Sequence, residues 1–133
     1  GDDGEPPVSE VRVLVGARDY DASTRFYRDL LGLPVQEEWH APDGRGTLFS
    51  VGAAVIEVIE SSPHHPAEEP RGVAVAIEVE DADALHERVA AAGVTPTESL
   101  GDRPWGHRSF QIRDPAGLAL TFFQVLPAPA PAR

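Results

Sequence analysis

The carboxylate of Glu57 is the group in this sequence whose chemistry most needs an explanation. It stands in the apolar run AAVIEVIE (53–60), which predicts a strand. Side chains alternate between the two faces of a strand, so Glu57 shares a face with Val55 and Ile59. A buried carboxylate needs a counter-charge, a metal ion or a proton. The sequence therefore leaves three roles open for Glu57: ion-pair partner, metal ligand or catalytic base.

Two tryptophans with nearby histidines form a second set of candidate residues. Trp39 and His40 are adjacent, and Trp105 stands two residues before His107, in both cases near the end of a predicted strand. A large ring at such a place can stack on a flat ligand. Each tryptophan could equally be a core or interface residue, and the sequence leaves both interpretations open.

The composition limits the chemistry and the partners. The 133 residues include no cysteine, which excludes disulfides, thiol nucleophiles and zinc–thiolate sites, so a metal would need His, Asp or Glu. Twenty-two acidic against eleven basic residues leave a formal charge of −11. This charge argues against a nucleic-acid partner and favours a cationic small ligand, although it also fits a solvated, mutually repelling surface.

The sequence also argues against a membrane partner. No apolar run approaches the roughly 20 residues that a membrane helix needs. The opening GDDGEPP is acidic and contains proline, unlike the leader of a secreted protein. We therefore expect a cytoplasmic protein.

The chain predicts the same order of elements twice. A first helix is expected from Asp21, as its N-cap, to Gly32, and a second follows Glu80 and ends at Gly93. The predicted strands are 10–17, 34–40, 46–52 and 53–60 in the first half, and 73–80, 94–101, 106–114 and 118–125 in the second. The turn DPAG (114–117) joins the last two strands.

An internal repeat supports this order. Asp19 matches Asp81, an offset of 62, and VIE (55–57) matches ALT (119–121), an offset of 64. The chain is therefore predicted to be an α+β protein built from a duplicated βαβββ unit. The expected organisation is a flexible N-terminal segment 1–9, a single domain 10–126 and a Pro/Ala tail 127–133. Within the domain we expect module one at 10–60, a linker at 61–71 and module two at 72–126.

Three segments carry a family resemblance: RDYDASTRFYRDLLGLP (18–34), VEDADALHERVAAAG (79–93) and PWGHRSFQIRDPAGLALTFFQ (104–124). In their order and spacing they resemble the vicinal oxygen chelate superfamily of glyoxalases, bleomycin-resistance proteins and dioxygenases. The nearest branch is the metal-free, bleomycin-resistance-like one. The resemblance implies two βαβββ modules whose curved mixed sheets enclose a cleft, and a homodimer.

The same resemblance implies where a metal would bind. In metal-using members four inward-facing positions supply His and Glu ligands, and they correspond here to Arg12, Glu57, Ala74 and Thr121. A register slipped by one replaces Arg12 with Val13 and Ala74 with Val73, and neither register adds a ligand. Divalent ions bind imidazole or carboxylate, not guanidinium or methyl groups. We therefore expect no metal and no cofactor, and an ion pair between Arg12 and Glu57.

These observations predict a metal-independent protein that binds and sequesters a small molecule, an antibiotic or natural product, as in drug resistance. The molecule would be flat, and the acidic balance favours a cation. The alternative is a lyase, isomerase or dioxygenase of the same superfamily that uses Glu57 as general base or metal ligand. No catalytic residue is assigned. The expected ligand-binding residues are Arg12, Trp39, His40, Phe49, Glu57, Trp105, His107, Phe110 and Thr121.

Overall fold

The computed structural model describes residue 4 and residues 7–128. Most of the predicted N-terminal segment 1–9 and residues 129–133 of the predicted tail 127–133 lie outside the described residues. The chain divides into two compact units, residues 1–68 and 69–133. The boundary falls inside the predicted linker 61–71.

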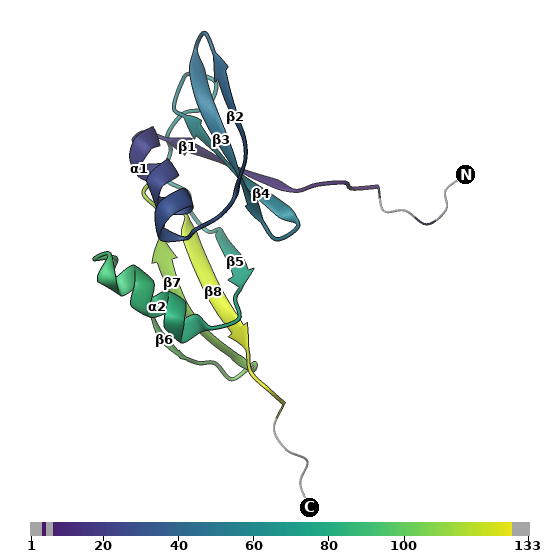
Figure 1. Cartoon of the computed structure of the whole chain (residues 1–133), viewed down its shortest axis with the longest axis vertical. Coiled ribbons are helices and arrows are strands. Elements are labelled where there is room, and N and C mark those ends of the chain that lie inside the picture. Colours follow the sequence, from purple (N-terminus) through teal and green to yellow (C-terminus); the bar gives the residue numbers. More distant parts are fainter. Residues whose placement is uncertain (1–3, 5–6, 129–133) are drawn as a thin grey trace, which may run out of the picture. The chain divides into compact units, whose positions relative to one another are not determined.

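The first unit contains one four-stranded sheet and one helical segment (Figure 1). The strands are β1 (Arg12–Ala17), β2 (Val35–Ala41), β3 (Gly44–Val51) and β4 (Ala54–Glu60), in the sheet order β1-β4-β3-β2. The helical segment is α1 (Tyr20–Arg25) followed by η1 (Phe26–Leu30). Only β1 and β4 run parallel, because the helical segment connects β1 to the rest of the sheet as a crossover.

The second unit repeats this topology. Its strands are β5 (Ala74–Glu78), β6 (Glu98–Asp102), β7 (His107–Arg113) and β8 (Ala119–Val125), in the order β5-β8-β7-β6, and its helix is α2 (Ala82–Ala91). Again the first and last strands pair in parallel. The α+β class and the two βαβββ modules are confirmed.

Strand register confirms the internal repeat residue by residue. Arg12 lies opposite Val55 in the first unit, and Ala74 lies opposite Ala119 in the second. The two positions on the first strands are 62 apart and those on the last strands 64 apart, the offsets that the sequence shows. Residues with the same offset therefore occupy equivalent places in the two sheets.

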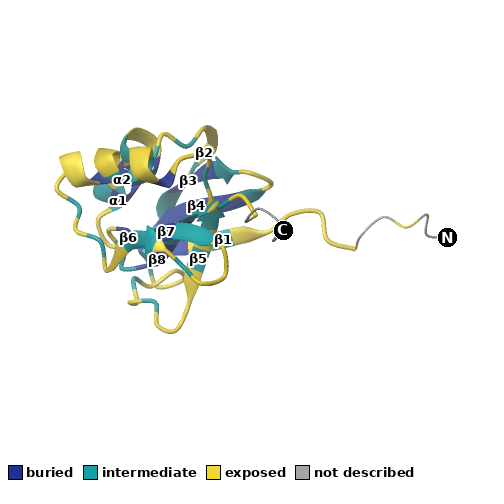
Figure 2. Ribbon diagram, turned by 90° about the horizontal axis from the view of Figure 1, so that it is seen from below, coloured by how far each residue is buried: buried dark blue, intermediate teal, exposed yellow. Residues whose placement is uncertain are grey.

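Each core lies between a helix and one face of its sheet. In the first unit Tyr27 and Phe49 are fully buried, with ring centroids 5.6 Å apart. In the second unit Phe110 and Val89 are fully buried in the same way. The buried colour runs along the central strands in Figure 2, whereas much of the helical surface is exposed. In the first unit the opposite face of β3 and β4 is buried as well, at Leu48, Val55, Glu57 and Ile59.

The start of the first helix differs from the prediction. Asp19, not Asp21, is the N-cap, and its carboxylate accepts a hydrogen bond from the Ala22 backbone N–H at 3.0 Å. Asp81 caps α2 in the same way, with Ala84 as donor. Each helix start has two aspartates two positions apart. In both cases the first aspartate is the N-cap, because its side chain precedes the helix and accepts a hydrogen bond from a backbone N–H in the first turn.

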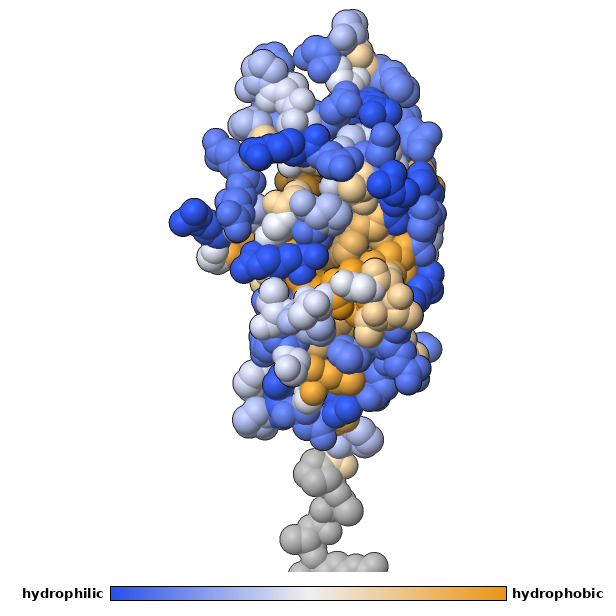
Figure 3. Space-filling model, turned by 90° about the vertical axis from the view of Figure 1, so that its left-hand side faces the viewer, coloured by the Kyte–Doolittle hydropathy of each residue, from blue (hydrophilic) through white to orange (hydrophobic). Residues whose placement is uncertain are grey.

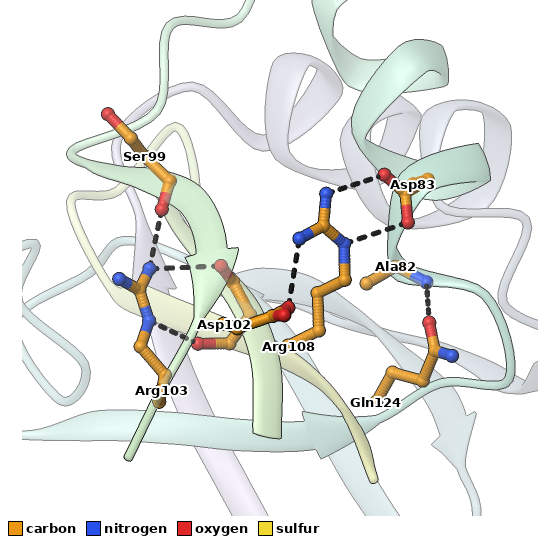
Figure 4. A network of polar contacts seen from close by, with 8 residues as sticks. Ala82, Asp83, Ser99, Asp102, Arg103, Arg108 and Gln124 are labelled. Carbon is orange, nitrogen blue, oxygen red and sulfur yellow. Dashed lines mark hydrogen bonds and ion pairs between the residues drawn. The ribbon is translucent and has the colours of Figure 1, made fainter. Parts of the chain in front are cut away.

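An arginine network fastens α2 to the sheet of the second unit (Figure 4). Arg108 on β7 donates two hydrogen bonds of 2.9 Å to Asp83 on α2 and one of 2.9 Å to Asp102 on β6. Chiefly through its hydrogen bonds, Arg108 holds the pKa of the Asp83 carboxyl below its usual range. The ion pair should therefore stabilise the folded state only while Asp83 is ionised.

We expect Asp83→Asn to lower the unfolding midpoint at pH 7 and to lose that effect in acid. Because the folded-state pKa of Asp83 is depressed, its contribution is present above the unfolded value of about 4 and disappears as the pH falls through the lowered pKa. Urea unfolding of both proteins between pH 7 and pH 2 measures this. Glu87→Gln, on the exposed side of α2, is the matched control. A difference that persists unchanged at low pH would contradict the prediction.

Candidate functional site

Strand alternation places Glu57 on the sheet face opposite the helix. Val58, the next residue on β4, is fully buried in the core on the helix side, so Glu57 points the other way. Its register partners are Leu14 on β1 and Leu48 on β3. Arg12 lies two residues before Leu14, and therefore on the same face. The predicted common face of Arg12 and Glu57 is thus confirmed.

Both oxygens of the Glu57 carboxylate have a partner. Oε1 accepts a hydrogen bond from Nη1 of Arg12 at 3.3 Å, and Oε2 accepts one from the indole Nε1–H of Trp39 at 2.9 Å. Glu57 is only 8% exposed. The two contacts satisfy the requirement that a buried carboxylate be paired and hydrogen-bonded. We call Arg12, Trp39 and Glu57 the Glu57 cluster.

Trp39 reaches Glu57 because β3 has a glycine between them. Trp39 on β2 lies opposite Gly46 on β3, and Gly46 lies opposite Ile59 on β4. A Cβ atom on Gly46 would overlap the indole, including its Nε1. The missing side chain lets the ring lie across β3 and bring its N–H to the next strand. Sequence reasoning missed this contact, and the signal that could have revealed it is a glycine inside a strand, which often marks a close approach.

Within the Glu57 cluster, the side chain of Arg12 is more exposed to solvent than that of Glu57. Its side chain is 44% exposed, whereas that of Glu57 is 10% exposed. The Nε of Arg12 also pairs with the carboxylate of Glu10. Glu10 first, and Glu57 second, raise the pKa of the Arg12 guanidinium. The ion pair that the sequence predicts is present, but it is buried only on the Glu57 side.

The donor set at the four family positions does not fit a divalent metal. Thr121 on β8 is the equivalent of Glu57, and its hydroxyl accepts a hydrogen bond from the Gln111 side chain at 3.1 Å. Ala74 contributes a methyl group. The slipped register fails as well, because Val13 lies opposite the core residue Ile56 and Val73 lies outside β5. Among the described residues no group of three or more His, Asp or Glu side chains could hold a metal ion.

The remaining predicted site residues lie in three kinds of place. Phe49 and Phe110 are fully buried in the two cores, so neither presents a surface to a ligand. His40 follows Trp39 on β2 and therefore faces the other side of the sheet from the Glu57 cluster. In the second unit His107 stacks on Phe123 with ring centroids 4.4 Å apart, and Trp105 is 68% exposed in the turn between β6 and β7.

A cavity of about 310 Å³ lies beside α1, β2 and β3 in the first unit, and Trp39 of the Glu57 cluster is one of its lining residues. Arg45 stacks over the Tyr20 ring at 4.4 Å and also pairs with Glu60 at 3.2 Å. The hydroxyls of Tyr20 and Thr47 are hydrogen-bonded to each other. Among the residues around the cavity, the sequence singled out only Trp39 and His40 as ligand-binding candidates. The cavity is lined by Tyr20, Asp21, Thr24, Arg25, Arg28, Glu38, Trp39, His40, Arg45, Gly46 and Thr47.

The surface is mostly hydrophilic on the face drawn in Figure 3, with hydrophobic patches between the polar side chains. Exposed apolar side chains include Leu14, which is 58% exposed beside Glu57. Within the described part of the chain, no helix has the length and apolar character needed to cross a bilayer.

Known proteins resemble the chain over most of its length. The uncharacterized protein YraH of Bacillus subtilis (strain 168) is 27% identical over 128 residues, which cover 88% of this chain and 97% of YraH. TnmS3, described as an antibiotic binding protein from Streptomyces sp. CB03234, has a TM-score of 0.74 at 21% identity, over 91% of this chain and 99% of TnmS3. A lactoylglutathione lyase from Agrobacterium tumefaciens has a TM-score of 0.65 at 26% identity, over 90% of this chain and 95% of the lyase.

A family model matches most of the chain. It is described as the Glyoxalase/Bleomycin resistance protein/Dioxygenase superfamily and matches residues 11–122, which include every strand and helix except the end of β8. The chain belongs to the glyoxalase, bleomycin-resistance protein and dioxygenase superfamily.

Proposed function

We propose that this chain is a metal-independent binding protein that sequesters a flat, cationic antibiotic or natural product. The observation that carries the proposal is the state of Glu57. It is the only carboxylate at the four family metal positions, and both of its oxygens are already engaged by Arg12 and Trp39. A guanidinium at 3.3 Å repels a divalent cation from the place where a metal would bind. Metal-using members of the superfamily polarise substrate oxygens with a bound metal ion, and this chemistry requires a metal site that these residues do not form.

Two further features support a binding role. The formal charge of −11 attracts cations over long range and raises the rate at which they encounter the protein. The indole of Trp39 and the exposed Leu14 side chain border Glu57 and offer apolar surface to a flat ring. The description of TnmS3 as an antibiotic binding protein agrees with this class of function.

The second candidate is an enzyme of the same superfamily, a lyase, isomerase or dioxygenase, in which Glu57 is a general base or a metal ligand. The similarity to the lactoylglutathione lyase of Agrobacterium tumefaciens favours it. The contacts of Glu57 argue against the base, because both of its carboxylate oxygens are already engaged, one by Arg12 and the other by Trp39. We therefore rank the binding protein first.

Titration with flat cations tests the proposal. Trp105→Phe leaves Trp39 as the single tryptophan reporter, because the chain contains only two tryptophans. Calorimetric titration of the unchanged chain is the control, since Trp105 is itself an expected ligand contact. We expect proflavine, ethidium or berberine to quench Trp39 fluorescence and to saturate at one molecule per chain. Because no metal takes part, dialysis against EDTA should leave the binding curve unchanged. The ligand should be recovered chemically intact after long incubation.

Each other outcome of this titration has a definite meaning. Binding that EDTA abolishes and zinc, nickel or manganese restores would favour the metal-dependent enzyme. Conversion of the ligand would favour an enzyme of either kind. Failure of all three cations to bind would contradict the proposed class of ligand.

We also propose that the chain forms a two-fold homodimer. Among the described residues each sheet has two edge strands that pair on one side only, namely β1 and β2 in the first unit and β5 and β6 in the second. Open edges of this kind are commonly covered by association. Light scattering at micromolar concentration should give twice the chain mass of 14.3 kDa. A mass of one chain under these conditions would contradict the dimer.

A further inference from the structure

We propose that the Glu57 carboxylate is a receptor for an amidinium or guanidinium group on the ligand, and that the Arg12 side chain is a built-in occupant which the ligand displaces. This inference rests on the proposed binding function and adds the chemical class of the charged group and a self-inhibiting contact.

The first step is that the site already holds a group of this class. The Arg12 guanidinium contacts Glu57 Oε1 through a single nitrogen at 3.3 Å, while its Nε is bonded to Glu10. A guanidinium and a carboxylate bind most strongly through two parallel hydrogen bonds of about 2.7–2.9 Å. The contact in this structure is therefore long and single. A free amidinium, which is not tethered to a strand, can align with the carboxylate better than Arg12 does.

The second step is that the carboxylate has capacity for such a group. Each carboxylate oxygen can accept two hydrogen bonds. Glu57 Oε2 accepts one bond from Trp39 and Oε1 accepts one from Arg12. Trp39 fixes the orientation of the carboxylate and uses one acceptor site of Oε2, while Arg12 occupies the place that an incoming cation would take. An incoming planar cation can therefore bind without displacing the indole.

The third step is that Arg12 can leave without becoming an isolated charge. Its side chain is 44% exposed, so water solvates the guanidinium when it moves. Glu10 remains its partner, because this ion pair does not involve Glu57. Exposed pairs of this kind are weak. In the absence of ligand, Arg12 therefore occupies the Glu57 carboxylate through a contact that a ligand can replace.

The fourth step concerns the body of the ligand. Leu14 is the register partner of Glu57 on β1 and is 58% exposed, and the Trp39 ring lies across β3 on the other side. An aromatic ring attached to the amidinium would cover this apolar surface. A neutral amide of the same shape would gain the same coverage but would lack the charge-assisted hydrogen bonds.

The test compares benzamidine with benzamide in four proteins that all carry Trp105→Phe. One has no other change, and the others add Arg12→Gln, Arg18→Gln or Glu57→Gln. Arg18 is the matched control, because it is exposed, follows β1 directly and donates a hydrogen bond to the Ala67 carbonyl rather than to Glu57. Both arginine variants replace Arg by Gln, so they have the same net charge. Binding is measured by Trp39 fluorescence and by the NMR shift of the Trp39 indole N–H, which reports directly on Glu57.

We expect Arg12→Gln to bind benzamidine about threefold to tenfold more tightly than the parent, because apparent affinity rises with the fraction of chains whose site is free. Arg18→Gln should stay within about twofold of the parent, since it changes only the overall charge. Glu57→Gln should lose binding, and benzamide should bind the parent and Arg12→Gln proteins equally weakly.

The inference would be overturned if Arg12→Gln bound benzamidine no better than Arg18→Gln, or if benzamide and benzamidine bound alike. Absence of benzamidine binding in all four proteins would overturn it as well. If proflavine, ethidium or berberine still bound in that case, the proposed function would stand and only the displaced-arginine inference would fall. If neither benzamidine nor any of the three flat cations bound, both the proposed function and the displaced-arginine inference would be contradicted.

Discussion

Trp39→Phe is expected to destabilise the protein by about 1.5 to 3 kcal/mol, because hydrogen bonds to charged groups contribute about this much and a buried acceptor left unpaired is costly. Phenylalanine keeps an aromatic ring but has no N–H for Glu57 Oε2, which Trp39 reaches at 2.9 Å. The 8% exposure of Glu57 leaves little room for water to replace the lost donor. Equilibrium urea unfolding measures the change.

A double-mutant cycle separates the hydrogen bond from the loss of ring volume. Glu57→Met removes the carboxylate and keeps an unbranched side chain of similar size, and combining it with Trp39→Phe should cost less than the sum of the two single changes by about 1 kcal/mol. Trp105→Phe is the matched control, because that ring is 68% exposed and its loss should change stability by no more than about 0.5 kcal/mol. Additive single changes would show that the hydrogen bond contributes nothing.

Gly46→Ala is expected to cost about 1 to 3 kcal/mol, the usual range for overpacking, although it adds only one methyl group. The new Cβ would overlap the Trp39 indole. The ring can move away only by leaving its place across β3, and this movement breaks its hydrogen bond to Glu57. We therefore expect a red-shifted Trp39 emission together with the loss of stability.

Gly44→Ala is the control for this change, since Gly44 lies on the same strand and a Cβ there would meet only the Glu60 carbonyl oxygen at 4.0 Å. It should be neutral or slightly stabilising, because alanine restricts the unfolded chain more than glycine does. In a Trp39→Ala background, Gly46→Ala should lose most of its cost. An equal cost with and without the indole would mean that Gly46 is needed for another reason.

The sequence alone determined the duplicated βαβββ order, whereas the expected pairing of Arg12 with Glu57 came from the family resemblance, which places both at positions that face a common centre. The order depends on short-range regularities: an alternation of two along each strand, aspartates and glycines at the helix ends, and a constant offset between the halves. The offsets of 62 and 64 reappear as strand register. The first N-cap was the exception, because Asp19 and Asp21 carry the same chemical signal and only the path of the backbone distinguishes them.

Only the tertiary structure decided what the carboxylate of Glu57 binds with its second oxygen. The contact with Trp39 depends on the registers of two strand pairs, β2 with β3 and β3 with β4, and on a glycine in the middle strand. Such registers are set by packing between distant segments, and a shift of one residue would turn every side chain to the other face. For the same reason the sequence identified the aromatic character of Phe49 and Phe110 but did not show that both are buried in the cores. The exposure of Arg12, on which the displacement by a ligand depends, is likewise a property of the folded sheet edge and of its contact with Glu10.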